Sequence, residues 1–118
     1  MTAGYVMERL HQLRTPPFDA QILFDELSRV ESMISEEVMN EGPVRLYADA
    51  DGQAALLAGP PYDGMYLHYL CAKVDLMMQE YDSANTEMTV FTGLYDEYAK
   101  WFRRKHLPGR GAAVKGYV

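Results

Sequence analysis

The chain has 118 residues, of which 48% are hydrophobic and 24% charged, and its formal net charge is −6. This composition is typical of one globular domain with a modest core, and it excludes a mostly disordered chain. The single cysteine excludes an intrachain disulfide framework. The sequence has no apolar run of about 20 residues, so we expect no membrane span. Because a signal-peptide pattern is also absent, we expect synthesis in a reducing cytosol.

The first predicted element is a short helix over residues 3–14. Val6, Leu10 and Leu13 fall at i, i+4 and i+7, which places them on one apolar stripe. The proline pair that follows Thr15 ends the helix, because a residue before proline is disfavoured in the helical region.

A longer helix is predicted to begin at Asp19, which can cap it, and to stop at Asn40 and Gly42. Its apolar residues repeat at steps of four and three, as a buried stripe requires. The stripe comprises Leu23, Leu27, Val30 and Ile34, widened by Ile22, Met33 and Val38. The opposite face reads Asp25, Arg29, Ser32 and Glu36.

Residues 44–59 change in character and leave two alternatives open. Two short apolar runs flank a turn at 49–52, which fits a small β-hairpin, but the segment fits an irregular excursion between helices equally well. Asp49 and Asp51 begin like a calcium loop. Position twelve of such a loop requires Glu and is Pro60 here, so we expect a solvated turn instead.

Two further helices complete the prediction. A third begins after Gly59 and runs to about Tyr81, with a broad apolar and aromatic face. The polar residues 82–86 predict a break, and a fourth helix follows to about His106. The predicted fold is all-α, a small bundle of about four helices over residues 1–108 with a long excursion or small hairpin near 44–59.

The C-terminus differs from the rest of the chain in charge. Residues 1–99 carry all seventeen acidic residues and five basic ones, a net −12, whereas residues 100–118 carry six basic residues and no acid. One reading is a basic helix end followed by a solvated tail. The other is a flexible basic arm at 109–118 that docks on an acidic partner. A DNA-binding face is disfavoured because the body is acidic and lacks a nucleic-acid-binding motif.

No grouping of residues points to catalysis. His11, His68 and His106 lack the spacing of metal ligands, and His68 is expected to be a partly buried, hydrogen-bonded residue. Cys71 is expected to be a small buried residue rather than a nucleophile. Nucleotide-binding loops and hydrolase motifs are absent from the sequence, so we expect no enzyme, cofactor or metal.

The nine tyrosines and eight methionines indicate an interaction surface. Both residue types also fill small cores, which is the competing interpretation. On the third helix, however, they cover more than one face, which favours a subunit interface. The residues that we expect at this interface are Tyr62, Tyr66, Tyr69, Trp101 and Arg104.

Three blocks of this sequence resemble the small head–tail connector proteins of tailed bacteriophages. They are Leu27–Val38, Pro61–Asp75 and the closing block Tyr95–Pro108, and the likeness covers most of residues 20–108. The resemblance implies a structural virion protein, made in the bacterial cytoplasm, without catalytic residues. It implies a ring of about twelve subunits beneath the portal, through which packaged DNA passes without sequence-specific binding.

The resemblance also implies two kinds of neighbour, the portal protein and the next head-completion or tail-terminator protein. A C-terminal arm would grip the portal, and its candidate residues are Arg110, Val114, Lys115, Tyr117 and Val118. Asp49 and Asp51 are candidates for contact with the channel lumen or a neighbouring subunit. The alternative function is a small helical regulator or adaptor that binds an acidic protein through its basic C-terminus.

Overall fold

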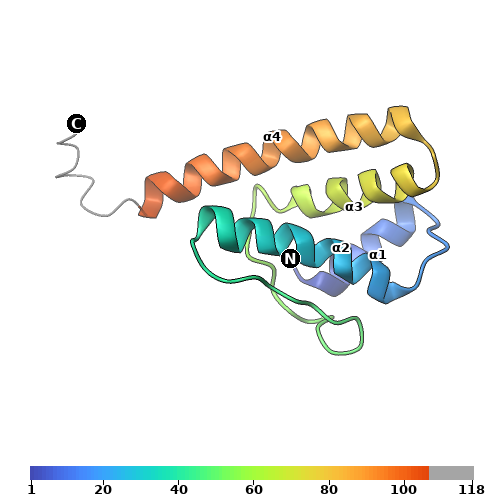
Figure 1. The fold of residues 1–118 in the computed structure, drawn as a ribbon, viewed down its shortest axis with the longest axis horizontal. Coiled ribbons are helices and arrows are strands. Elements are labelled where there is room, and N and C mark those ends of the chain that lie inside the picture. The colour runs from blue at the N-terminus through green and yellow to red at the C-terminus, as the bar shows by residue number, and fades with distance from the viewer. Residues whose placement is uncertain (107–118) are drawn as a thin grey trace.

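The computed structural model describes residues 1–106, and within them the chain forms four α-helices and no strand (Figure 1). The helices are α1 (Ala3–Leu13), α2 (Ala20–Met33), α3 (Gly64–Met77) and α4 (Tyr81–His106). α2 continues into one π-helical turn, η1 (Ile34–Val38). The predicted all-α class is therefore confirmed.

α1 begins at a side-chain cap and buries one face. Thr2 Oγ1 accepts a hydrogen bond from the backbone N–H of Tyr5 at 3.2 Å, which satisfies a free donor of the first turn. Val6 and Leu10 are fully buried, as their spacing predicts. Leu13 is 49% exposed, because it is the last helical residue and the chain turns away after it. The predicted stripe is one residue too long.

α2 and η1 supply the central apolar stripe. The four predicted stripe residues are 0–1% exposed, whereas Ile22 lies outside the stripe and is 41% exposed. Asp19 occupies the N-cap position, but its side chain makes no capping hydrogen bond. Asn40 has a φ of 59°, a left-handed conformation that ends the helix where the sequence predicts.

α3 and α4 form an antiparallel helical hairpin, and the break between them is not where the sequence predicts it. The corner lies at residues 78–80, where Gln79 has a φ of 63°. Residues 82–86 belong to the first turns of α4. The prediction of a polar break there is wrong because carboxyl and hydroxyl side chains also suit a helix N-terminus. Ser83 Oγ, in the first turn of α4, donates to Asp75 Oδ2 of α3 at 2.6 Å and so joins the two helices.

The segment from residue 42 to 48 runs along α2 without forming a hairpin. Polar side chains on one face of α2 and η1 form hydrogen bonds with the backbone of every second residue of the segment. The pairs are Ser35 with Gly42 (2.6 Å), Ser32 with Val44 (3.0 Å), Ser28 with Leu46 (2.9 Å) and Gln21 with Ala48 (2.8 Å). We call this arrangement the α2 ladder. It gives the segment partners that a second strand would otherwise provide.

The rest of the excursion is tied to the N-terminus. The backbone N–H of Ala3 donates to the carbonyl of Ala54 at 3.0 Å, and that of Gly4 donates to the carbonyl of Gly52 at 2.7 Å. Thr2 and Ala55 form one isolated antiparallel bridge. Of the two alternatives for residues 44–59, the irregular excursion is the one that forms.

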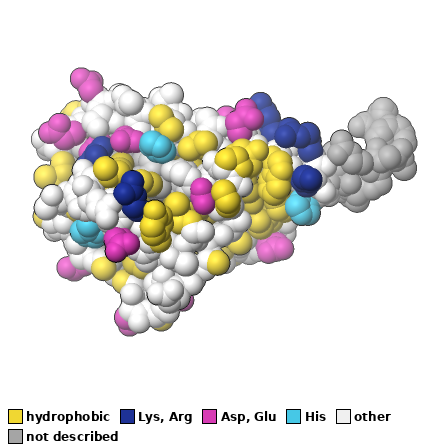
Figure 2. All heavy atoms as spheres, turned by 180° about the vertical axis from the view of Figure 1, so that it is seen from behind, with side chains coloured by type: hydrophobic (Ala, Val, Ile, Leu, Met, Phe, Trp, Pro, Cys, Tyr) yellow, Lys and Arg dark blue, Asp and Glu magenta, His cyan; other side chains and the backbone are white. Residues whose placement is uncertain are grey.

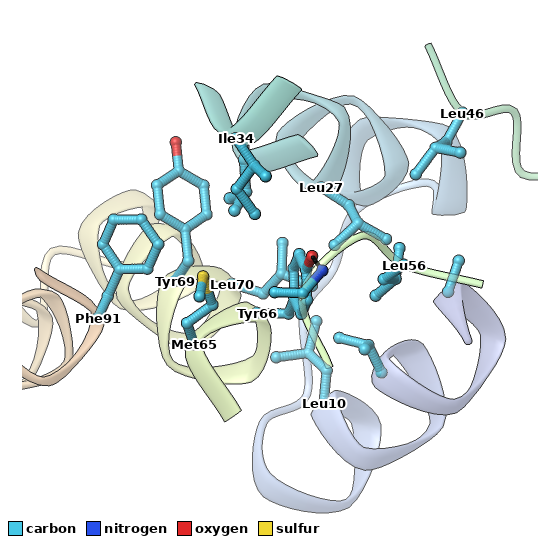
Figure 3. Close-up of a cluster of buried hydrophobic side chains, with 14 of the residues drawn as sticks. Leu10, Leu27, Ile34, Leu46, Leu56, Met65, Tyr66, Tyr69, Leu70 and Phe91 are labelled. Atoms are coloured by element: carbon cyan, nitrogen blue, oxygen red, sulfur yellow. Dashed lines mark hydrogen bonds between the residues drawn. The ribbon is translucent and has the colours of Figure 1, made fainter. Parts of the chain in front are cut away.

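The core lies between the four helices and is closed below by the excursion (Figures 1 and 3). Figure 3 shows Tyr66 between Leu27 and Leu10, with Leu46 and Leu56 of the excursion at the edge. Tyr69 lies beside Phe91 of α4, with their ring centroids 5.0 Å apart. The excursion is thus part of the core and not an appendage.

Candidate functional site

The C-terminal part of α4 carries aromatic side chains that extend from the core to the surface. The Trp101 ring lies 5.9 Å from Tyr62 and 5.8 Å from Tyr98, and Phe102 stacks on His106 at 3.9 Å. Tyr98 is 2% exposed, whereas Trp101 and Phe102 are half-buried. Figure 2 shows apolar side chains gathered beside Lys, Arg and His side chains at one end of the molecule.

Basic side chains surround this aromatic cluster. Lys100, Arg103, Arg104 and Lys105 lie in the last two turns of α4, where positive charge complements the helix dipole. Arg103 Nη2 donates to the backbone carbonyl of Glu37 at 3.4 Å. The basic helix end that the sequence predicts is therefore present over residues 100–106, and Arg104 is exposed there, as its assignment to an interface requires.

An acidic surface lies on the other side of α4, on and just after η1. Glu36 and Glu41 are exposed, and Glu37 Oε1 accepts a hydrogen bond from the Tyr95 hydroxyl at 2.7 Å. Burial and this carboxylate raise the pKa of Tyr95 well above its usual range. A groove of about 460 Å³ separates the end of η1 from α4, and its walls include Glu37, Glu41, Phe102 and Arg103.

Tyr66, which the sequence assigns to a subunit interface, lies inside the subunit. It is 0% exposed, and its hydroxyl donates to Glu31 Oε1 at 2.6 Å and accepts from the backbone N–H of Ala58 at 2.8 Å. Tyr69 is 7% exposed and packs on Phe91, and burial raises its pKa to about 12. Neither residue is accessible to a neighbour, because α3 needs its aromatic faces for its own core. Tyr62, Trp101 and Arg104 remain at the surface.

Glu31 is a buried carboxyl that sequence reasoning missed. It is 2% exposed, and its two oxygens accept hydrogen bonds from the Tyr66 hydroxyl and from the backbone N–H of Leu57 at 2.8 Å. Burial raises its pKa above the usual value for glutamate. The signal was present in the sequence, because Glu31 is four residues after Leu27 and three before Ile34 and so lies on the apolar stripe.

A second polar cluster joins the end of α1 to the helical hairpin. Arg14 binds both oxygens of Asp75 at 2.7 and 2.9 Å and Glu87 Oε2 at 3.1 Å. Glu87 Oε1 lies 2.6 Å from His68 Nδ1, so His68 is a hydrogen-bonded residue, as expected. The guanidinium of Arg14 holds the pKa of the Asp75 carboxyl below its usual value. Residues so distant in sequence gave no local signal of this cluster.

The two aspartates of the excursion differ in their roles. The Asp51 carboxylate accepts the backbone N–H of Tyr47 at 2.6 Å and so stabilises its own turn. Asp49 is exposed. Of the pair, Asp49 has the side chain that is more available to a neighbour or a channel.

The described residues contain no site for a metal ion. Among residues 1–106, no group of three His, Cys, Asp or Glu side chains could hold one. Cys71 is 2% exposed, as predicted, and burial raises the pKa of its thiol to about 11. No helix in this part of the chain is long and apolar enough to cross a membrane.

A second exposed apolar surface lies at the corner between α3 and α4. Its members are consecutive or nearly so and are each 40–56% exposed. They are Leu76, Met77, Met78 and Tyr81. Met77 belongs to this surface because α3 ends there. Apolar residues that cluster at the surface mark interaction sites more often than isolated ones do.

The predicted docking-arm residues, Arg110, Val114, Lys115, Tyr117 and Val118, lie outside the described residues. Comparisons of the chain with protein-family models, with curated proteins and with solved structures find no match.

Proposed function

We propose that this chain is a structural virion protein, a head–tail connector that forms a ring beneath the portal. The ring extends the DNA channel and joins the capsid to the tail or to the next head-completion protein. The proposal rests on the resemblance of three sequence blocks to this class of protein, and the geometry adds support to it.

The observation that carries the proposal is that the three resembling blocks meet in space. Tyr95 of the closing block donates its hydroxyl proton to Glu37 of the first block, at 2.7 Å. Tyr62, at the start of the middle block, packs on Tyr98 and Trp101 of the closing block at 5.8 and 5.9 Å. The likeness therefore follows one packed unit, α2 and η1 against α3 and α4.

Two further features support a subunit with several neighbours. Apolar side chains reach the surface near both ends of α4, at Tyr81 and at Trp101, about 30 Å apart along the helix. The net −12 charge of residues 1–99 suits the wall of a DNA channel, because negative charge repels phosphate. Asp49, exposed on the excursion, remains the candidate for the lumen.

The experiment is the native mass of the purified chain, alone and mixed with a portal ring from the same genome. We expect a complex with about one copy of this chain per portal subunit. Deleting residues 109–118 should abolish portal binding and leave the circular dichroism of the helices unchanged. A matched variant, Arg110→Gln with Lys115→Gln, separates the charge of the arm from its apolar residues. A chain that ignores the portal in every mixture contradicts the proposal.

A second candidate function follows from the basic end of α4, which carries four cations and no acid over residues 100–106. In that case the chain is an adaptor that binds an acidic protein partner. Such an adaptor should be a monomer or dimer in the native-mass measurement and should not form a ring with or without the portal.

A further inference from the structure

The two sides of α4 differ in chemical character near its C-terminus. Trp101 and Arg103 are two positions apart on a helix of 3.6 residues per turn, so their side chains leave the axis about 200° apart. Arg103 faces η1, since its Nη2 lies 3.4 Å from the carbonyl of Glu37. Trp101 faces Tyr62, 5.9 Å away on the segment before α3. The two residues therefore belong to opposite flanks of the subunit.

The Trp101 flank is aromatic and basic. Lys105 follows Trp101 by four positions and Arg104 by three, which places both next to it on the helix surface. Trp101 is half-buried and Lys105 is exposed, and within residues 1–106 Lys105 makes no ion pair. An aromatic anchor with cations at its rim is the composition of a protein interface.

The η1 flank is acidic and carries a groove. Glu36 and Glu41 are exposed and make no ion pair in the described part of the chain. A groove of about 460 Å³ on this flank, which Glu41 lines and Glu36 does not, has apolar side chains of Val38, Met39 and Phe102 in its walls. Glu37, Arg103 and His106 also line it, and Arg103 is bonded to the Glu37 carbonyl. The exposed glutamates of the flank outnumber this arginine, so its charge is the complement of that of the opposite flank.

We infer that these flanks bind one another between copies, the Trp101 flank of one subunit against the η1 flank of the next. Such a contact is heterologous, so every copy keeps one free flank of each kind and the contact repeats until a ring closes. Apolar contact at Trp101 supplies most of the affinity, and the Lys105 and Glu41 charges set orientation and rate of encounter. This inference rests on the proposed ring-forming function and adds its interface.

Thiol cross-linking tests the direction of the contact. Chains carrying Lys105→Cys are mixed with chains carrying Glu41→Cys and treated with a short bismaleimide, both alone and with the portal ring. We expect heterodimers from the mixture, and a ladder of multimers from the chain that carries both changes. Cys71 is buried, and burial raises the pKa of its thiol, so we expect it to stay unreacted in the folded chain. Asp82→Cys, at the opposite end of α4, replaces Lys105→Cys in the control mixture.

Reciprocal charge reversal tests the complementarity. Lys105→Glu and Glu41→Lys should each weaken self-association by about two- to fivefold in sedimentation, and the double variant should restore it. Trp101→Ala should weaken it about 30-fold or more, at unchanged circular dichroism. The inference is overturned if chains carrying Lys105→Cys couple to one another. It is also overturned if they couple to Glu41→Cys no better than the control does.

The outcomes separate this interface from the proposed function. A chain that binds the portal but gives no heterodimer in either setting retains the connector function and refutes the interface. A chain that forms the cross-linked ladder but ignores the portal retains the interface and refutes the connector.

Discussion

Replacing Tyr66 by Phe removes one buried hydroxyl and nothing else from the core. The hydroxyl donates to Glu31 Oε1 at 2.6 Å and accepts from the backbone N–H of Ala58 at 2.8 Å. A hydrogen bond to a charged group contributes about 1.5–3 kcal/mol and a neutral one about 0.5–1.5 kcal/mol. We therefore expect Tyr66→Phe to lower the free energy of unfolding by about 2–4 kcal/mol, a large part of a typical total.

Urea denaturation followed by circular dichroism measures this loss. With a slope typical of small domains, the midpoint should fall by about 1–2 M. Tyr5→Phe is the matched control, because Tyr5 is 48% exposed and the same change there should stay within about 0.5 kcal/mol. A loss at Tyr66 as small as that of the control would refute the role assigned to the buried hydroxyl.

The stability deficit of Tyr66→Phe should depend on pH, and the direction of that dependence follows from the pKa of Glu31. Burial raises the pKa of Glu31 in the folded state, so ionised Glu31 costs stability as pH rises from its unfolded pKa through its folded pKa. Removing the hydroxyl takes away a donor that favours the ionised form. The deficit of Tyr66→Phe should thus be smallest in acid and grow toward neutral pH.

The remaining predictions concern the second cluster, two glycines and the cysteine. Arg14→Met should lower the free energy of unfolding by about 2 kcal/mol at pH 7. Because the fold lowers the pKa of Asp75, its ion-pair stabilisation is lost as Asp75 protonates, so the deficit measured in urea melts should be smaller at pH 3 than at pH 7. Gly4→Ala should destabilise the fold by about 1–3 kcal/mol, because its Cβ would lie 2.8 Å from a backbone oxygen. Gly93→Ala, in the open middle of α4, should instead stabilise it by up to about 1 kcal/mol. Equal effects of the two changes in denaturant melts would contradict this packing. Cys71 should react with a thiol reagent far more slowly in the native than in the denatured chain, because it is buried and its thiol pKa is about 11; equal rates would show that the core is open.

Periodicity predicts the helices that bury a stripe and fails at their ends. The spacing of Leu23, Leu27, Val30 and Ile34 is sufficient to predict α2, because the stripe and the helix have the same repeat. The corner between α3 and α4 depends instead on Gln79, whose φ is 63°. Nothing about glutamine predicts this left-handed backbone conformation. Polarity at 82–86 marks a helix start as readily as a break.

In the candidate site too, the sequence predicts the features that belong to one helix and misses those that depend on distant residues. Trp101 and the basic residues of α4 are surface features of one helix, so composition and spacing suffice to find them. The sequence does not separate an interface position from a core position for Tyr66, because tyrosine is common in both. Its burial depends on Glu31, 35 residues away, and on Ala58, and single-helix patterns do not contain such pairings.

The α2 ladder has an evolutionary consequence. Serine and glutamine side chains of α2 hold residues 42–48 through the backbone of that segment, and the N-terminus holds residues 52–56 through backbone groups as well. The side chains that hold the excursion are those of the buried Leu46, Leu56 and Ala58, of Asp51, which binds the backbone of its own turn, and of Arg45, which pairs with Asp25. The exposed side chains that remain do not determine its position. Their identities are therefore free to diverge while the path of the chain persists, so one scaffold can present changing surface chemistry to whatever lies beside it.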